Sequence, residues 1–236
     1  MSDAEPKSEG PMWRPLSREQ RRVLGVLMEK AKTTPEAYPM TINAVTTGCN
    51  QKNNRAPQME LESTEVETIL DELRKVGAVT ELQGTGRVNK FRHNMYQWLG
   101  VEKVELAVMA ELLLRGQQTV GELRARAARM EPIADMNELK PVLDQLVAKR
   151  LVLELTPPGR GQVITHNLYA ERELQKVRDL VAAGGFAVSS DEADSAPRLT
   201  PSSPRAPTDV NAQLQSLQEL LDHVVRRIEQ LEEKLG

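Results

Sequence analysis

The chain has 236 residues, of which 39% are apolar, 28% charged and only 3% aromatic, a composition typical of one or two globular domains with aliphatic cores. No apolar run approaches the roughly 20 residues of a membrane-spanning helix, the first fifteen residues lack the apolar stretch of a signal peptide, and a single cysteine, Cys49, excludes an internal disulfide framework, so we expect a cytoplasmic protein. The net charge of −3 comes mostly from residues 171–236, while residues 16–98 and 101–170 are close to neutral, which weighs against a strongly nucleic-acid-binding surface.

Two helices are predicted at the start of the chain. Ser17 and Gln20 have the spacing of a capping box, which predicts a helix beginning after Ser17. Thr41 is expected to cap a second, short helix whose apolar face carries Ile42, Val45 and Cys49.

A third helix and a hairpin follow. Thr64 and Glu67 form another capping-box pair, so this helix is expected to begin near Ser63–Thr64. Gly77 is suited to end it, since glycine tolerates the left-handed backbone. Strands are predicted over 78–82 and 88–96, joined by a turn with two glycines.

The unit occurs twice. Residues 70–96 and 143–169 align without a gap at an offset of 73 and share 11 of 27 positions, among them the pairs His93/His166 and Asn94/Asn167. Three helices followed by a two-stranded hairpin are the winged-helix arrangement. We therefore predict a mainly α fold with small β-hairpins (α+β), with two tandem winged-helix domains at residues 16–98 and 101–170.

The rest of the chain is assigned by composition. Residues 1–15 and the Ser- and Pro-rich residues 184–209 are predicted to be disordered, with a trailing helix at 171–183 between the second domain and the linker. Residues 210–236 carry an unbroken heptad seam, which predicts a coiled-coil helix and a homo-oligomer. The alternative is one amphipathic helix that docks on its own domains. The seam residues are Val210, Leu214, Leu217, Leu221, Val224, Ile228, Leu231 and Leu235.

Two long segments carry a resemblance to a known family. The stretches "KTTPEAYPMTINAVTTGCNQKNNR" and "LLLRGQQTVGELRARAARM" resemble the YceH family of uncharacterised bacterial proteins, in order and at matching spacing. The resemblance covers about residues 16–170. It implies two tandem winged-helix domains and supplies no activity or site residues, and the linker and heptad segment lie outside it.

The loop at residues 50–61 is the first candidate site. At about twelve residues it is long for a compact domain. Its amides, and the two bases Lys52 and Arg55, could contact phosphates, base edges or a peptide backbone. Alternatively, the asparagines form turns and caps that hold the shape of the loop. This alternative explains the presence of the asparagines but not that of Arg55. The candidate contact residues are Asn50, Gln51, Lys52, Asn53, Asn54 and Arg55.

The hairpins are the second candidate. The third helix of the first unit is acidic, which disfavours ordinary insertion into a DNA groove. Residues 83–93 carry Arg87, Lys90 and Arg92, residues 156–167 carry Arg160, and neither segment contains an acid, so these parts of the hairpins could contact phosphates or a minor groove. Alternatively Arg87 and Arg160 are ordinary solvated residues that flank a turn.

A third basic group lies on the second helix of the second unit. Arg126 and Arg129 are neighbours at i, i+3, with Arg124 nearby. They could clamp a phosphate, or they could pair with Glu122 and Glu131, because a charge run is usually a solvated face.

No motif for catalysis, a cofactor or a metal is present, so an enzyme is not expected. His93 and His166 are expected to be hairpin residues rather than ligands. The first hypothesis is a DNA-binding, regulator-like protein that self-associates through its C-terminal helix. The second is a protein-interaction adaptor that does not bind DNA, because winged helices also serve as docking modules.

Overall fold

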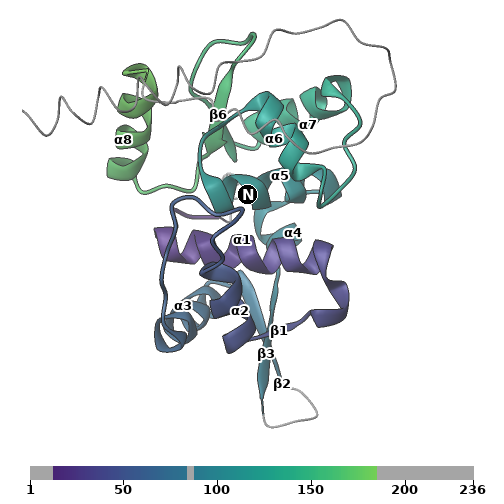
Figure 1. Ribbon diagram of the computed structural model, residues 1–236, viewed down its shortest axis with the longest axis vertical. Coiled ribbons are helices and arrows are strands. Elements are labelled where there is room, and N and C mark those ends of the chain that lie inside the picture. The colour runs from purple at the N-terminus through teal and green to yellow at the C-terminus, as the bar shows by residue number, and fades with distance from the viewer. Residues whose placement is uncertain (1–12, 84–87, 185–236) are drawn as a thin grey trace, which may run out of the picture. The chain divides into compact units, whose positions relative to one another are not determined.

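The computed structural model describes residues 13–83 and 88–184, all within the first of the two units into which the chain divides, Met1–Ser189 (Figure 1). Eight α-helices, one short 3₁₀-helix and two small antiparallel sheets are formed by the described residues. No helix among them is long and apolar enough to cross a membrane. The fold is therefore mixed, with helices predominating.

The first copy of the repeat combines its helices with a three-stranded sheet. The sheet has the order β1-β3-β2, with Thr41 opposite Lys90 and Thr80 opposite Arg92. The elements are α1 (Arg18–Thr33), the 3₁₀-helix η1 (Pro35–Ala37), β1 (Met40–Thr41), α2 (Ile42–Cys49), α3 (Ser63–Lys75), β2 (Val79–Gln83), β3 (Asn89–His93) and α4 (Met95–Leu99).

The second copy has the same order of helices and strands, and its sheet has the matching order β4-β6-β5. The duplication in the sequence is thus a duplication of structure. The elements are α5 (Lys103–Arg115), β4 (Gln118–Thr119), α6 (Val120–Ala127), α7 (Met136–Ala148), β5 (Val152–Glu154) and β6 (Val163–His166), followed by α8 (Glu171–Ala182).

The first helix of each copy forms the centre of the structure. All residues from Arg21 to Glu29 on α1 and from Glu105 to Leu114 on α5 are buried, as expected of helices covered on every side. The two helices pack against each other, and Gly25 lets α1 approach Leu114 so closely that an added Cβ would lie 2.8 Å from its Cγ. In Figure 1 the first sheet lies on the side of α1 remote from α5. The two copies consequently share one hydrophobic core.

Several local predictions are confirmed. Ser17 and Gln20 form the capping box of α1, and Thr41 caps α2. Gly77 has a φ of 76° after α3, in the left-handed region. The equivalent position in the second copy, 73 residues later, is Arg150. It has a φ of 58°, a left-handed conformation that is unfavourable for residues other than glycine.

Three local predictions need correction. The segment 88–96 is not one strand, because β3 ends at His93 and α4 begins at Met95. The capping box of α3 is formed by Glu62 and Glu65, two residues before the predicted pair, since Glu62 holds the extended backbone of an N-cap. The short strands β1 and β4 were not predicted, because two residues are too few to show an alternating pattern.

The shared His-Asn pair has the same structural role in both copies. The Nδ1 atoms of His93 and His166 each accept the backbone N–H two residues later, at 3.2 Å. The side chain of the next residue donates to a backbone carbonyl just after the preceding helix. Asn94 donates to Gly77 after α3 at 3.0 Å, and Asn167 donates to Arg150 after α7 at 2.9 Å. Burial lowers the pKa of His93 to about 4 and that of His166 well below its usual value, so both rings are neutral acceptors.

Candidate functional site

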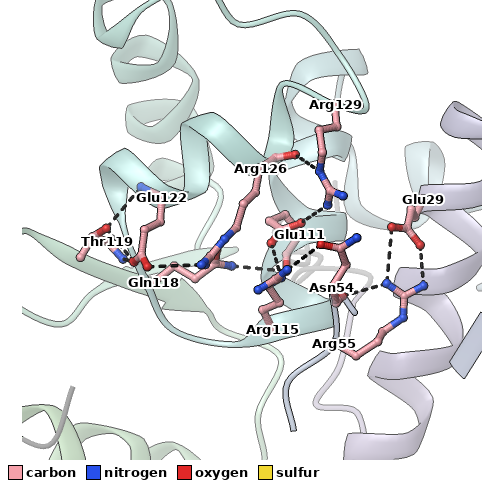
Figure 2. A network of polar contacts seen from close by, with 10 residues as sticks. All are labelled: Glu29, Asn54, Arg55, Glu111, Arg115, Gln118, Thr119, Glu122, Arg126 and Arg129. Carbon is pink, nitrogen blue, oxygen red and sulfur yellow. Dashed lines mark hydrogen bonds and ion pairs between the residues drawn. The ribbon is translucent and has the colours of Figure 1, made fainter. Parts of the chain in front are cut away.

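The loop between α2 and α3 is organised around a buried arginine. The side chain of Arg55 is fully enclosed and forms an ion pair with Glu29 of α1, with Nη2 2.5 Å from Oε2 (Figure 2). Its Nε donates to the carbonyl of Gly48 at 2.9 Å, and its Nη2 to Oε1 of Gln51 at 2.9 Å. The expectation that Arg55 contacts an external ligand is therefore wrong, because its donors are used inside the protein.

The asparagines of the loop also make internal hydrogen bonds. Asn50 exchanges two with the backbone of Leu61, at 2.8 and 2.9 Å, and thereby closes the loop. The Oδ1 of Asn54, which has a φ of 61°, accepts from Arg115 of α5 at 2.7 Å. The loop thus connects the two copies of the repeat.

Of the six candidate contact residues in the loop, Lys52 and Asn53 are exposed, whereas Gln51 is half-buried beside Arg55. One lysine and one amide form a small surface, so residues 50–55 are a connecting element more than a contact surface.

The arginines of the second copy take part in a network that continues from this loop. Arg126 forms an ion pair with Glu122 at 3.3 Å and donates to Gln118 at 2.8 Å, so the pairing alternative applies to it (Figure 2). Arg124 donates to the carbonyls of Ile133 and Ala134, at 3.2 and 3.1 Å, between α6 and α7.

Glu111 lies at the centre of this network and is completely buried. Its Oε1 lies 3.1 Å from Nε of Arg115 and its Oε2 3.6 Å from Nη2 of Arg129, within ion-pair distance but not aligned as hydrogen bonds. Burial raises the pKa of Glu111, an effect that the neighbouring guanidinium groups oppose without cancelling it. Arg129 therefore pairs with Glu111, and the predicted partner Glu131 pairs with Lys32 instead.

The first sheet presents an exposed basic strand. Lys90 and Arg92 lie on the same face of β3, with the buried Phe91 between them pointing to the core. Both are exposed, and β3 contains no acid. This strand keeps the predicted basic character and leaves it available to a ligand.

A groove of about 560 Å³ adjoins this strand, where the starts of α2 and α3 meet β3. Thr41, which lines the groove, is also the cross-strand partner of Lys90, so the lysine lies at the groove's edge. Among the described residues of the lining, Glu67 is the only charged one, and Ile42 and Val88 are the apolar ones. Hydroxyl and amide groups form the rest of the lining, from Thr41, Asn43, Ser63, Thr64 and Asn89.

The second sheet does not repeat this surface. Val163 and Thr165 occupy the positions of Lys90 and Arg92, and both are buried. Arg160 is exposed in the turn between β5 and β6, between two glycines. Beside the turn a groove of about 400 Å³ runs along α7, lined by apolar residues that include the exposed Met136 and Val147.

Two predicted features lie beyond the described residues, and the predicted place of Cys49 is confirmed. Arg87 and the heptad residues 210–236 are outside them. Cys49 is buried on the core face of α2, and burial raises the pKa of its thiol to about 12. Within residues 13–83 and 88–184 no group of His, Cys, Asp or Glu is arranged to hold a metal ion.

The structure defines a protein built from a duplicated unit of helices and a small sheet, in which the first copy exposes a basic strand and the second has buried, uncharged residues at the corresponding positions. The family described as "Protein of unknown function, DUF480" matches residues 16–160, and the chain belongs to this family of bacterial proteins.

Similar proteins carry the designation UPF0502. One from Rhodopirellula baltica is 54% identical over 170 residues, which is 72% of this chain and 71% of that protein. One from Geobacter sulfurreducens is 46% identical over 157 residues, 65% and 72% of the two chains. One from Burkholderia cenocepacia is 40% identical over 170 residues, 70% and 72%. The family agrees with the resemblance drawn from the two long motifs.

Proposed function

We propose that this protein is a non-enzymatic DNA-binding protein of the winged-helix kind, in which the first repeat contacts the phosphate backbone through β3 and the adjoining groove. The observation that carries the proposal is the exposed pair Lys90 and Arg92 at the edge of a groove lined by hydroxyl and amide groups. Such groups, together with Lys and Arg, supply most protein contacts to DNA phosphates.

The acidic surface of α3 restricts the way in which DNA could bind. Glu65, Glu67 and Glu72 are exposed, and duplex DNA carries one charge per roughly 1.7 Å of its axis, so this helix would be repelled from a groove. The sheet, rather than α3, therefore supports the proposal. Glu67, which lines the groove, opposes binding in this arrangement.

Fluorescence anisotropy with a labelled random-sequence duplex, over a series of salt concentrations, tests this surface. The double variant Lys90→Ala/Arg92→Ala should weaken binding about tenfold and reduce the salt slope by roughly 1 to 2 units, since each lost phosphate contact contributes about 0.9. Glu67→Gln should strengthen binding.

A matched control is available on α8. Lys176 and Arg178 are exposed and have the same types and spacing as Lys90 and Arg92. The variant Lys176→Ala/Arg178→Ala removes the same charge from another surface. If it weakens binding as much as the β3 variant, only net charge matters and the proposed surface is wrong.

Self-association through residues 210–236 is a second part of the proposal, and it rests on the heptad seam. Two or more chains would combine weak contacts through effective concentration. Light scattering of the full chain and of a chain ending at residue 204 measures this. A full-length chain with a monomer's mass contradicts it and favours the seam docking on its own chain.

A protein-interaction adaptor remains the second candidate, and the groove along α7 favours it. Met136 and Val147 expose 44% and 37% of their surface there, unusual for large apolar residues beside a groove. A protein partner retained by the wild type should be lost with Met136→Lys/Val147→Lys and kept with Leu180→Lys, an equally exposed position on α8. Equal retention by all three would exclude the α7 groove as the docking site.

A further inference from the structure

A cavity of about 310 Å³ lies where the two repeats meet, away from the basic strand β3. The first half of α1 and the loop before α3 form one wall. The end of α5, β6 and α8 form the other. We call this space the inter-repeat cavity.

The walls of the inter-repeat cavity are strongly cationic. Among the described residues, Glu173 is the only acid in the lining, and four arginines also line it: Arg18, Arg21, Arg22 and Arg115. Arg21 forms an ion pair with Glu173 and donates to the carbonyl of Leu16 at 2.6 Å. Arg115 is paired with Glu111 behind the wall. The positive charges of Arg18 and Arg22 are then left without a carboxylate in the lining.

Arg22 gives the strongest indication of an anion site in the cavity, because it is almost fully buried, with 1% of its surface exposed. Its guanidinium donates only to the carbonyls of Cys49 and Pro57, at 2.9 and 2.5 Å, and forms no ion pair with any described carboxylate. Burial, with repulsion from Arg55, lowers its pKa to about 10. Buried charges are ordinarily paired, so this arginine lacks the counter-charge that such a position favours.

The remaining walls supply a rigid, partly apolar surface. The ring of Tyr169 stacks on His166 with centroids 3.9 Å apart, and Arg21 lies 4.5 Å above the same ring. Leu113 and Met59 add aliphatic surface. Burial keeps the His166 ring neutral, so the positive charge of the cavity belongs to the arginines. A ligand matching these walls has an anionic group and a small apolar part.

We infer that the inter-repeat cavity binds a small organic anion, a phosphate or carboxylate joined to a compact apolar group, which supplies the missing counter-charge beside Arg18 and Arg22. Guanidinium groups bind both kinds of anion through paired hydrogen bonds. Because the walls come from both repeats, the bound anion would stabilise their contact. The site is independent of the proposed DNA surface.

Isothermal titration calorimetry of the full chain with phenyl phosphate tests the inference, with benzoate and inorganic phosphate as further arms. Phenyl phosphate should bind more tightly than inorganic phosphate, because only the former reaches the apolar wall. Comparison with benzoate distinguishes a phosphate site from a carboxylate site, and binding of either organic anion supports the cavity.

Substitutions on exposed or partly exposed positions locate the binding. Arg18→Gln should weaken phenyl phosphate binding roughly tenfold, the effect of one charge-assisted contact. Glu173→Gln should tighten it about threefold by removing the acid from the wall. Arg172→Gln and Glu171→Gln are matched controls, since both residues are exposed on α8 and lie outside the cavity lining.

The inference is overturned if neither organic anion binds at millimolar concentration. It is equally overturned if Arg18→Gln weakens binding no more than Arg172→Gln, which would indicate a general charge effect. Far-UV circular dichroism of each variant checks folding. Loss of DNA binding in the Lys90/Arg92 variant leaves this titration unchanged, so failures of the two proposals are distinguishable.

Discussion

Replacing Arg55 by methionine gives the sharpest test of the loop between α2 and α3. The change removes the ion pair with the buried Glu29 and the donors to Gly48 and Gln51, and it leaves a carboxylate without its cation. Breaking one partner of a buried pair costs about 3–5 kcal/mol. We expect Arg55→Met to lower the free energy of unfolding by about that amount, a large part of the total for an ordinary domain.

A double-mutant cycle separates the ion pair from the rest of the loop. In Arg55→Met/Glu29→Met the buried carboxylate is gone, so only the lost donors remain, worth about 1 kcal/mol each. The double variant should therefore be more stable than Arg55→Met alone. Urea unfolding at pH 7, followed by far-UV circular dichroism, measures the four proteins of the cycle: wild type, Arg55→Met, Glu29→Met and the double variant.

The control for this cycle is Arg172→Met on the exposed face of α8, which should change stability by no more than about 0.5 kcal/mol. An Arg55→Met variant as stable as this control would refute the structural role assigned to the loop. A double variant that loses the sum of the two single losses would show that the two side chains are not coupled.

Three further predictions concern single positions. Arg150→Gly should raise the free energy of unfolding by about 0.5–1 kcal/mol, measured by thermal unfolding, because glycine adopts the left-handed backbone of this position without strain. The first repeat has Gly77 at the equivalent position, and a loss of stability in the variant would contradict this prediction. Burial raises the pKa of Glu111 above the ordinary carboxyl value of 4.5, so this group's contribution to wild-type stability falls as the pH rises from the unfolded-state pKa through the folded-state pKa. In urea unfolding, Glu111→Gln should therefore become more stable relative to wild type as the pH rises above about 4.5, and a stability difference that does not change with pH would exclude the effect. Burial lowers the pKa of His93 from 6.5 to about 4, so stability is lost as pH falls between these values. His93→Asn should flatten that limb, and an unchanged slope would assign the acid sensitivity to other groups.

Local signals predicted much of the fold. The capping pair Ser17 and Gln20, the glycine at 77 and the aligned repeat indicated the helices and the duplicated order of elements, because these features act over a few residues. The boundary between β3 and α4 was missed although Asn94 is a favoured N-cap residue, because α4 has only five residues and shows no helical period. At its start the Nδ1 of His93 accepts the backbone N–H of Met95. This bond is visible only once the chain is folded.

The role of the long loop could not be predicted from its composition. Amides and an arginine serve equally well to bind an external ligand or to fill an internal contact. The deciding residues, Glu29 and Arg115, lie 26 residues before Arg55 and 61 residues after Asn54, and no local pattern joins them. The basic strand, by contrast, was predictable, since alternation around Phe91 is itself local.

The difference in exposure between β3 and β6 has a consequence for the number of chains that a symmetric binding site would need. Within the described residues one strand, β3, is basic and exposed, because the corresponding positions of the second repeat, Val163 and Thr165, are uncharged and buried. The chain is therefore asymmetric despite its internal duplication. A DNA site with twofold symmetry offers two identical half-sites, and one such chain can match only one of them. Occupying both would take two chains related by the same twofold axis, so the internal repeat does not replace a dimer.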